Sequence, residues 1–85
     1  MKQKMYAIQD IKSDSFNAPF CSQNEATALR TVRQAMQGES LLSQYPEDYR
    51  LFELGEYDDT RGNITSENEP KWIANLTELT TKGAE

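Results

Sequence analysis

The chain has 85 residues, and its 9 Lys and Arg against 14 Asp and Glu give a formal net charge of −5 at pH 7. This length allows one small domain with a marginal core, which dimerisation would help to stabilise. The charge has the wrong sign for a protein that grips phosphates over its whole surface, and no apolar run approaches the ~20 residues that span a bilayer.

Two strands are predicted near the N-terminus, over Lys4–Asp10 and Ser15–Cys21, joined by a polar connection of hairpin length at Lys12–Asp14. Apolar side chains alternate along both strands, as expected where one face of a sheet is buried: Tyr6 and Ile8 in the first, and Phe16, Ala18 and Phe20 in the second. Pro19 has no N–H to donate to a neighbouring strand, so the second strand is expected at an edge of the sheet.

A helix is predicted from Ser22 to about Gln37. Ser22 and Glu25 have the spacing of a capping box, in which a hydroxyl and a carboxylate satisfy the first free N–H groups of a helix. Gly38 is placed to end the helix in a left-handed turn. Apolar residues at helical spacing form one stripe, made of Ala28, Leu29, Val32, Ala35 and Met36.

A third strand is predicted over Tyr49–Glu56, after a turn at Pro46. Alternation separates its side chains into two faces, with Phe52 and Leu54 on one and Tyr49, Leu51, Glu53 and Gly55 on the other. The polar loop from Asp58 to Asn63 lets the chain reverse into a short fourth strand over Asn63–Ser66.

These elements predict an α+β domain over residues 1–66, with the order ββαββ and an antiparallel sheet that one helix covers on one face. The other face is expected to stay open for an interface, because one helix cannot cover both, and Leu51 beside Tyr49 is expected on that open face. Residues 67–85 are predicted to form a C-terminal tail, a short helix or an arm, whose apolar residues such as Trp72 and Leu76 dock either on its own sheet or on a partner. Between the helix and Pro46, Ser40–Gln44 is expected to add a brief helical turn that brings Leu41 or Leu42 under the core.

The run PEDYRLFELGEYDD at residues 46–59, followed by Gly62 and Ile64, resembles the small nonstructural protein of gokushoviruses, the bacterial microviruses with single-stranded DNA genomes. Shorter similarities to that family lie at Tyr6–Asp10, at Phe16–Phe20 and in the helix at Ala26, Ala28 and Arg30. The resemblance covers about the first three-quarters of the chain. It implies a phage protein of the host bacterial cytoplasm that binds single-stranded DNA and favours genome single-strand synthesis over duplex replication.

The resemblance supplies no site residues, so candidates come from the chain itself. Residues 1–45 hold five basic and four acidic side chains, whereas residues 46–85 hold four basic and ten acidic ones. Four cations are candidates for contacts with phosphates: Lys4, Arg30, Arg33 and Arg50. Arg30 and Arg33 are neighbours on one helix face, where the alternative is a solvated surface balanced by nearby acids.

Aromatic side chains on the strands are candidates for stacking on bases, as in other single-strand binders. The candidates are Tyr6, Tyr49 and Tyr57. The alternative is that rings in so small a domain serve its core or an interface. A second hypothesis is therefore an acidic adaptor or homodimer that binds a phage or host replication or assembly protein through Tyr6, Leu51, Tyr57 and Trp72.

Catalysis, cofactors and metals are not expected. Histidine is absent, Cys21 has no second cysteine, and the four Gly residues are too scattered for a phosphate-binding loop. Asp58 and Asp59 suit a turn, because a calcium loop aligned on Gly62 would place Tyr57 and Asn68 where carboxylates are required.

Overall fold

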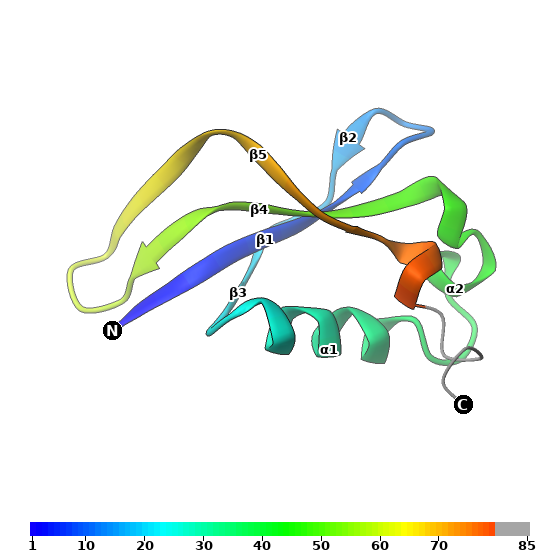
Figure 1. The fold of residues 1–85 in the computed structure, drawn as a ribbon, viewed down its shortest axis with the longest axis horizontal. Coiled ribbons are helices and arrows are strands. Elements are labelled where there is room, and N and C mark those ends of the chain that lie inside the picture. Colours follow the sequence, from blue (N-terminus) through cyan, green and yellow to red (C-terminus); the bar gives the residue numbers. More distant parts are fainter. Residues whose placement is uncertain (80–85) are drawn as a thin grey trace.

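A computed structural model of the chain describes residues 1–79 (Figure 1). In chain order the elements are β1 (Lys2–Asp10), β2 (Ser15–Phe16), β3 (Phe20–Ser22), α1 (Glu25–Ala35), α2 (Leu41–Gln44), the 3-10 helix η1 (Pro46–Asp48), β4 (Tyr49–Asp58), β5 (Asn63–Asn75) and the 3-10 helix η2 (Leu76–Leu79). The α+β class with an antiparallel sheet is confirmed. The order is more elaborate than ββαββ, since the second strand is divided and short helices are added.

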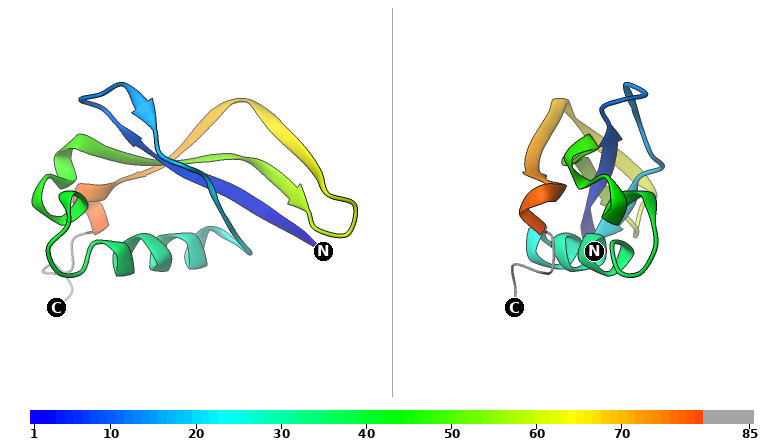
Figure 2. Two further views of the ribbon diagram at one scale, coloured as in Figure 1. Left: turned by 180° about the vertical axis from the view of Figure 1, so that it is seen from behind. Right: turned by 90° about the vertical axis from the view of Figure 1, so that its right-hand side faces the viewer.

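β1 runs through the middle of the sheet. It pairs on one side with β2 and β3 and on the other with β4, and β5 pairs with the far side of β4. α1 lies against one face, termed here the helix-side face, and the opposite one is the outer face (Figures 1 and 2). Among the described elements, the helices gather on the helix-side face and at one end of the sheet, which leaves the middle of the outer face uncovered (Figure 2).

The hydrophobic core lies between the helix-side face and α1. Its buried side chains come from β1, α1, β4 and η2, namely Tyr6, Ile8, Ala28, Val32, Met36, Tyr49, Leu51, Leu76 and Leu79. Val32 and Met36 belong to the apolar stripe predicted for the helix. The short helix predicted at residues 40–44 is present as α2, and its Leu42 packs partly against the core whereas Leu41 is 62% exposed.

The face of β4 that carries Tyr49 and Leu51 was predicted to stay open, and this prediction was wrong because that face is buried. Leu51 pairs with Ile8 in the β1–β4 register, and directly opposed residues share a face of a sheet. Leu51 therefore lies with Ile8 beneath α1, where it is fully buried together with Tyr49 in the core. Phe52 instead pairs with Ala7 and belongs to the outer face.

The strand predicted over Ser15–Cys21 is interrupted at Pro19. β2 and β3 occupy the same edge of β1, and between them the Asn17 N–H still donates to the Ile8 carbonyl at 2.8 Å. Proline cannot continue the hydrogen-bond ladder, so the edge position predicted for this segment is confirmed and its continuity is not.

The N-terminus of α1 is capped two residues later than predicted. The Asn24 side chain accepts from the Thr27 N–H at 2.9 Å, and the Thr27 hydroxyl accepts from the Asn24 N–H at 3.2 Å. Ser22 is unavailable as a cap because it is the last residue of β3. Gly38 has a φ of +76°, as its predicted place after the helix requires. No helix within residues 1–79 is long and apolar enough to cross a membrane.

β5 is much longer than the strand predicted over Asn63–Ser66, and the boundary proposed after Ser66 falls inside it. The β4–β5 register passes from Gly55–Ser66 to Glu53–Lys71, so the four residues 67–70 bulge out opposite a single residue of β4. These four residues are termed the β5 arch, and β5 rises there away from the helix side (Figure 1).

The chain after the β5 arch returns to the sheet and then to the core. Trp72 and its neighbours belong to β5, and the following η2 buries Leu76 and Leu79 against α1. The predicted tail therefore docks as strand and short helix together. Residues 80–85 of that tail lie outside the described part of the chain.

Candidate nucleic-acid interface

An aromatic cluster stands on the outer face. One cross-strand row runs from Phe16 through Gln9 and Arg50 to Asn75, and the next runs from Ala7 through Phe52 to Trp72. Opposed residues on neighbouring strands share a face, so the register alone brings the rings of β2, β4 and β5 together. The aromatic cluster consists of Phe16, Phe52 and Trp72.

The rings of the aromatic cluster are held in place and remain accessible. Phe16 and Phe52 meet edge to face, with ring centroids 5.4 Å apart and an interplanar angle of 71°. The Trp72 indole N–H donates to Asn75 Oδ1 at 3.1 Å. Trp72 is nevertheless 50% exposed and Phe16 41% exposed. The cluster thus offers ring surface to solvent at positions that neighbouring contacts already fix.

Charge is sorted between the two faces of the sheet. In the β1–β4 register rows every carboxylate lies on the helix-side face: Asp10 pairs with Tyr49, and Glu53, Glu56 and Asp58 pair with Tyr6, Lys4 and Lys2. The register-paired residues of the outer face comprise Gln3, Met5, Ala7, Gln9, Phe16, Cys21, Arg50, Phe52, Gly55, Tyr57, Ile64, Ser66, Trp72 and Asn75. Arg50 is the one charged residue in that set, whereas the exposed Glu69 belongs to the β5 arch, outside the register rows.

The predicted cations do not form one surface. Arg50 is exposed on the outer face beside the aromatic cluster, whereas Arg30 and Arg33 are exposed on α1, which covers the opposite face. Lys4 lies on the helix-side face and pairs with the Glu53 carboxylate at 3.4 Å. Of the four predicted phosphate contacts, only Arg50 stands next to exposed rings.

The predicted aromatic and interface residues also divide into two groups, one in the core and one on the outer face. Tyr6, Tyr49 and Leu51 are buried core residues, so the stacking and interface roles predicted for them have no exposed surface through which to act. Burial raises the pKa of the Tyr6 hydroxyl, with smaller contributions from Glu53 and Glu25. Tyr57 and Trp72, by contrast, lie on the outer face.

Phe16 and Phe52 were not predicted as site residues. Phe52 was assigned to the face expected beneath the helix, and Phe16 was interpreted as part of a buried strand face. A signal was present nonetheless: Phe52 alternates with the Tyr49 and Leu51 set, so if that set fills the core then Phe52 must face outward. The alternation of residues along β4 separates its side chains into two sets, but it does not show which set the helix covers.

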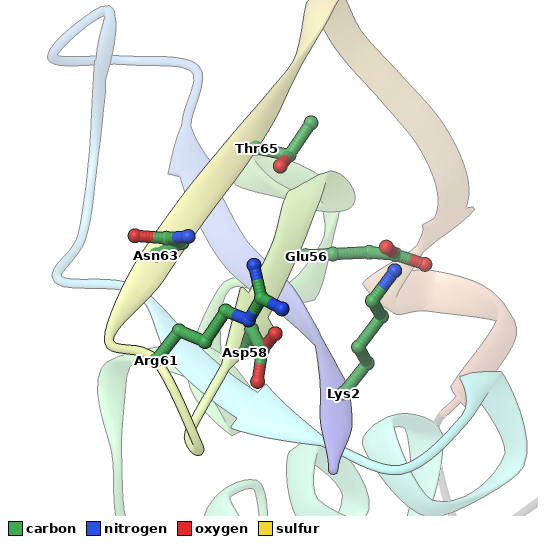
Figure 3. A pocket seen from close by; sticks show the side chains of 6 residues that line it. All are labelled: Lys2, Glu56, Asp58, Arg61, Asn63 and Thr65. Carbon is green, nitrogen blue, oxygen red and sulfur yellow. The ribbon is translucent and has the colours of Figure 1, made fainter.

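A polar pocket lies on the helix-side face of the ribbon formed by β1, β4 and β5, beyond the end of α1 (Figure 3). Its lining mixes two cations, two carboxylates and two neutral side chains: Lys2, Arg61, Glu56, Asp58, Asn63 and Thr65. Among the side chains that the structure describes, those of residues 1–66 and 69–79, no three Asp, Glu or Cys gather closely enough to hold a metal ion.

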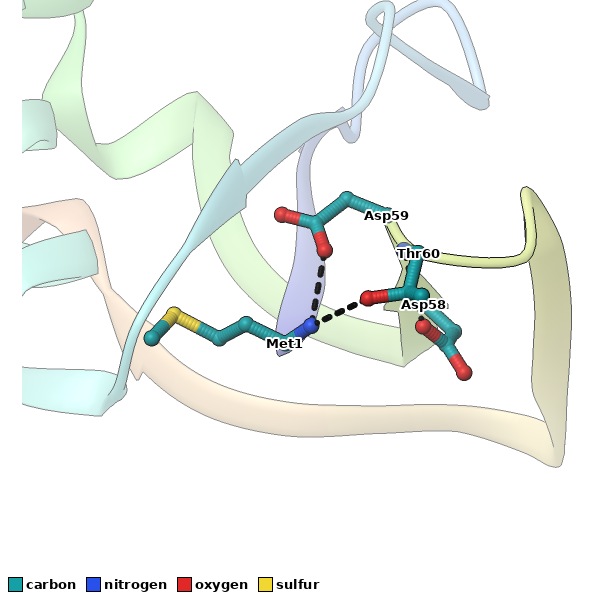
Figure 4. Close-up of polar contacts among 4 residues, drawn as sticks. All are labelled: Met1, Asp58, Asp59 and Thr60. Carbon is teal, nitrogen blue, oxygen red and sulfur yellow. Dashed lines mark hydrogen bonds and ion pairs between the residues drawn. The ribbon is translucent and has the colours of Figure 1, made fainter.

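The N-terminus closes the same end of the ribbon (Figure 4). The Met1 ammonium donates to Asp59 Oδ1 at 2.8 Å and to the Thr60 hydroxyl at 2.9 Å. This contact raises the pKa of the Met1 amine and lowers the pKa of the Asp59 carboxyl, because each charge favours the other. Of the two adjacent acids predicted to serve a turn, Asp58 accepts from the Thr60 N–H within the loop, and Asp59 anchors β1 to the β4–β5 loop.

The fold and the outer face define a small α+β protein built on an antiparallel sheet with one open face whose register-paired residues include no carboxylate. The family model described as Phage ORF5 protein matches residues 3–79. The chain belongs to this phage protein family, which agrees with the phage origin inferred from its sequence. Comparisons with curated proteins and with solved structures gave no match.

Proposed function

We propose that the protein is a non-catalytic phage accessory protein that binds single-stranded DNA through the outer face of its sheet. The observation that carries this proposal is the aromatic cluster of Phe16, Phe52 and Trp72 beside Arg50, on a face whose register-paired residues include no carboxylate. Sheet surfaces with exposed rings bind single strands because every base has a face on which a ring can stack.

Stacking and charge have separate tasks in this mechanism. Each base stacked on a ring contributes about 1–3 kcal/mol with little dependence on sequence. The Arg50 guanidinium contacts a phosphate of the same strand and releases its counterion. A duplex keeps its base faces inside the helix, so it offers the cluster nothing to stack on, and the preference for single strands follows from this difference.

The biological role that fits this surface is that of a gokushovirus-type (Microviridae) nonstructural protein in the host bacterial cytoplasm. Occupying the newly displaced genome strand would keep it from being copied into duplex, which favours single-strand synthesis. Arg30 and Arg33 form a separate exposed pair on α1, available to a strand that continues around the molecule or to another partner. A homodimer would double the number of bound segments and strengthen binding through avidity.

Binding of labelled oligonucleotides tests the proposal directly. We expect a labelled 12-nucleotide single strand to bind more tightly than the matching duplex at low salt, as measured by fluorescence anisotropy. Trp72→Ala should weaken binding about 5- to 150-fold, the equivalent of ~1–3 kcal/mol for one stacked base. Leu41→Ala is the matched control, since Leu41 is an exposed apolar residue of α2 away from the cluster. Equal binding of both DNA forms, or no loss in Trp72→Ala, would refute the proposal.

A protein partner is the second candidate, and the exposed apolar area favours it. Ile64 is 64% exposed and Trp72 is 50% exposed on a face with one charge among its paired residues, which is typical of surfaces that bind proteins. In this alternative the outer face joins two copies of the chain or receives a phage or host replication or assembly protein. Two results together would favour this alternative: the wild-type protein binds no DNA, and it forms a stable dimer in solution that dissociates in Trp72→Ala.

A further inference from the structure

We infer that the outer face carries a second contact patch for the same DNA strand, formed by Gln3, Tyr57 and Ile64. This inference rests on the proposed function and extends it, because it sets the length of single strand that one protein molecule holds. The three residues are consecutive cross-strand partners on β1, β4 and β5, so they share one face. They are termed the distal patch.

The distal patch resembles the aromatic cluster in chemistry. Tyr57 supplies a partly exposed ring, Ile64 an apolar surface that is 64% exposed, and Gln3 a hydrogen-bonding amide. Ile64 gains nothing from the core, since α1 lies on the other side of the sheet (Figures 1 and 2). An exposed ring and an exposed aliphatic side chain side by side suit the face and edge of a nucleobase.

A path between the two patches runs over Met5 of β1 and its exposed partner Cys21 of β3, neither of which is charged. In the same row Gly55 is buried and the β5 backbone at Thr65 and Ser66 stands against it, so a strand of DNA passes beside Gly55 and not over it. Neighbouring rows on the helix-side face hold the carboxylates Glu53 and Glu56, which point away from this path. A phosphate backbone that follows the outer face therefore meets no carboxylate in the register rows.

The spacing of the patches predicts a length for the bound strand. Ala7 and Gln3, the partners of Phe52 and Tyr57 on β1, are four positions apart, and a rise of about 3.3 Å per residue places the two rows roughly 13 Å apart. Stacked nucleotides advance about 3.4 Å each along one strand, so about five nucleotides reach from the aromatic cluster to the distal patch. Shorter oligonucleotides can occupy one patch only.

A length series of thymidine oligonucleotides tests this inference. For the wild-type protein we expect affinity to rise steeply between three and six nucleotides, once both patches are reached. In Tyr57→Ala and Ile64→Ser this rise should shrink by about fivefold or more, while the affinity for the three-nucleotide strand stays unchanged. Thr65→Ala is the matched control, because Thr65 neighbours Ile64 on β5 but pairs with Glu56 on the opposite face. Circular dichroism establishes that each variant is folded.

The outcomes separate this inference from the proposed function. If oligonucleotides bind but the two distal variants keep the wild-type dependence on length, the distal patch is refuted and binding at the aromatic cluster stands. If Thr65→Ala shows the same loss as Ile64→Ser, the effect belongs to the ribbon as a whole and the inference also fails. If no oligonucleotide binds, both the inference and the proposed function fail.

Discussion

Phe52 and Trp72 are directly opposed partners on β4 and β5. Their pairing depends on two irregularities, since the register shifts once beside Phe52 and again at the β5 arch. Without the arch, the second half of β5 would reach β4 in a different register, and a shift by one residue moves a side chain to the other face of a sheet. The arch therefore decides that the indole of Trp72 stands on the outer face beside the phenyl rings.

Arg50→Gln should change the salt dependence of DNA binding. Each phosphate neutralised on a single strand contributes about −0.7 to the slope of log affinity against log salt concentration, so this variant should lose roughly that much slope. Arg33→Gln is the control, because Arg33 lies on α1 across the sheet from the aromatic cluster. Measurements at several salt concentrations decide the point, and a larger change in Arg33→Gln than in Arg50→Gln would move the site to the helix.

Asn24→Ala should destabilise the protein more than Ser22→Ala does. The Asn24 side chain accepts from the Thr27 N–H, and loss of such a cap costs about 1 kcal/mol. The Ser22 hydroxyl lies 2.6 Å from the Thr27 hydroxyl and does not cap a helix N–H. Urea denaturation of the two variants gives the comparison. A larger loss of stability in Ser22→Ala would show that Ser22 caps the helix, as first expected from the sequence.

Local signals predicted much of the fold. The spacing of apolar residues indicated α1, the position of Gly38 indicated its end, and the alternation along residues 49–56 indicated β4. Each of these signals depends on residues within one or two turns of each other. The cap shows the limit of such reasoning, since Ser22 and Asn24 are both good cap residues and only the pairing of Ser22 with Lys4 in the sheet excludes the first.

The candidate site was less accessible to sequence reasoning, because it depends on contacts between distant segments. Tyr49 and Leu51 fill the core partly because Leu76 and Leu79 return from the C-terminal segment to pack with them. Phe52 faces outward as a consequence. The position of Trp72 depends on the β5 arch, whose residues show no helical or strand periodicity that would predict its register. Arg50 was the one predicted phosphate contact that the fold places beside the exposed rings.

Lys4→Met should cost more stability alone than when it is combined with Glu53→Gln. Glu53 is 6% exposed and its carboxylate has the Lys4 ammonium as its ion-pair partner at 3.4 Å. Removal of Lys4 leaves that carboxylate buried and uncompensated, at a cost of about 1–3 kcal/mol, while the neutral amide in the double variant avoids the penalty. Urea denaturation of both variants measures the difference. Equal stability of the two would mean that solvent already screens the Glu53 charge.

The contact between Met1 and Asp59 should make ribbon stability depend on pH in two directions. Because the pKa of Asp59 is lowered, the stability that its carboxylate contributes is present above pH 3.8 and is lost as the pH falls through the folded-state pKa. Because the pKa of the Met1 amine is raised, the stability that its ammonium contributes is present below pH 8.0 and is lost as the pH rises through the folded-state pKa. The contact is therefore fully effective between these two values.

Asp59→Asn tests this dependence. Removal of the carboxylate should return the pKa of the Met1 amine toward 8.0, as followed by NMR titration of residues at the end of the ribbon. Glu47→Gln is a suitable control, since it removes one negative charge from the exposed Glu47 of η1. An unchanged amine pKa in Asp59→Asn would show that the ammonium is not held at this site in solution.

Gly55→Ala should destabilise the packing of β5 against β4. A Cβ at residue 55 would collide with the Thr65 carbonyl oxygen and lie 2.8 Å from Ser66 Cα, and both of these are backbone atoms that cannot turn aside. We expect a loss of about 1–3 kcal/mol, typical of overpacking, as β5 moves away from β4. Ser66→Ala is the control because it alters the same row without adding volume. If Gly55→Ala is as stable as the wild type, β5 does not approach β4 closely at this row.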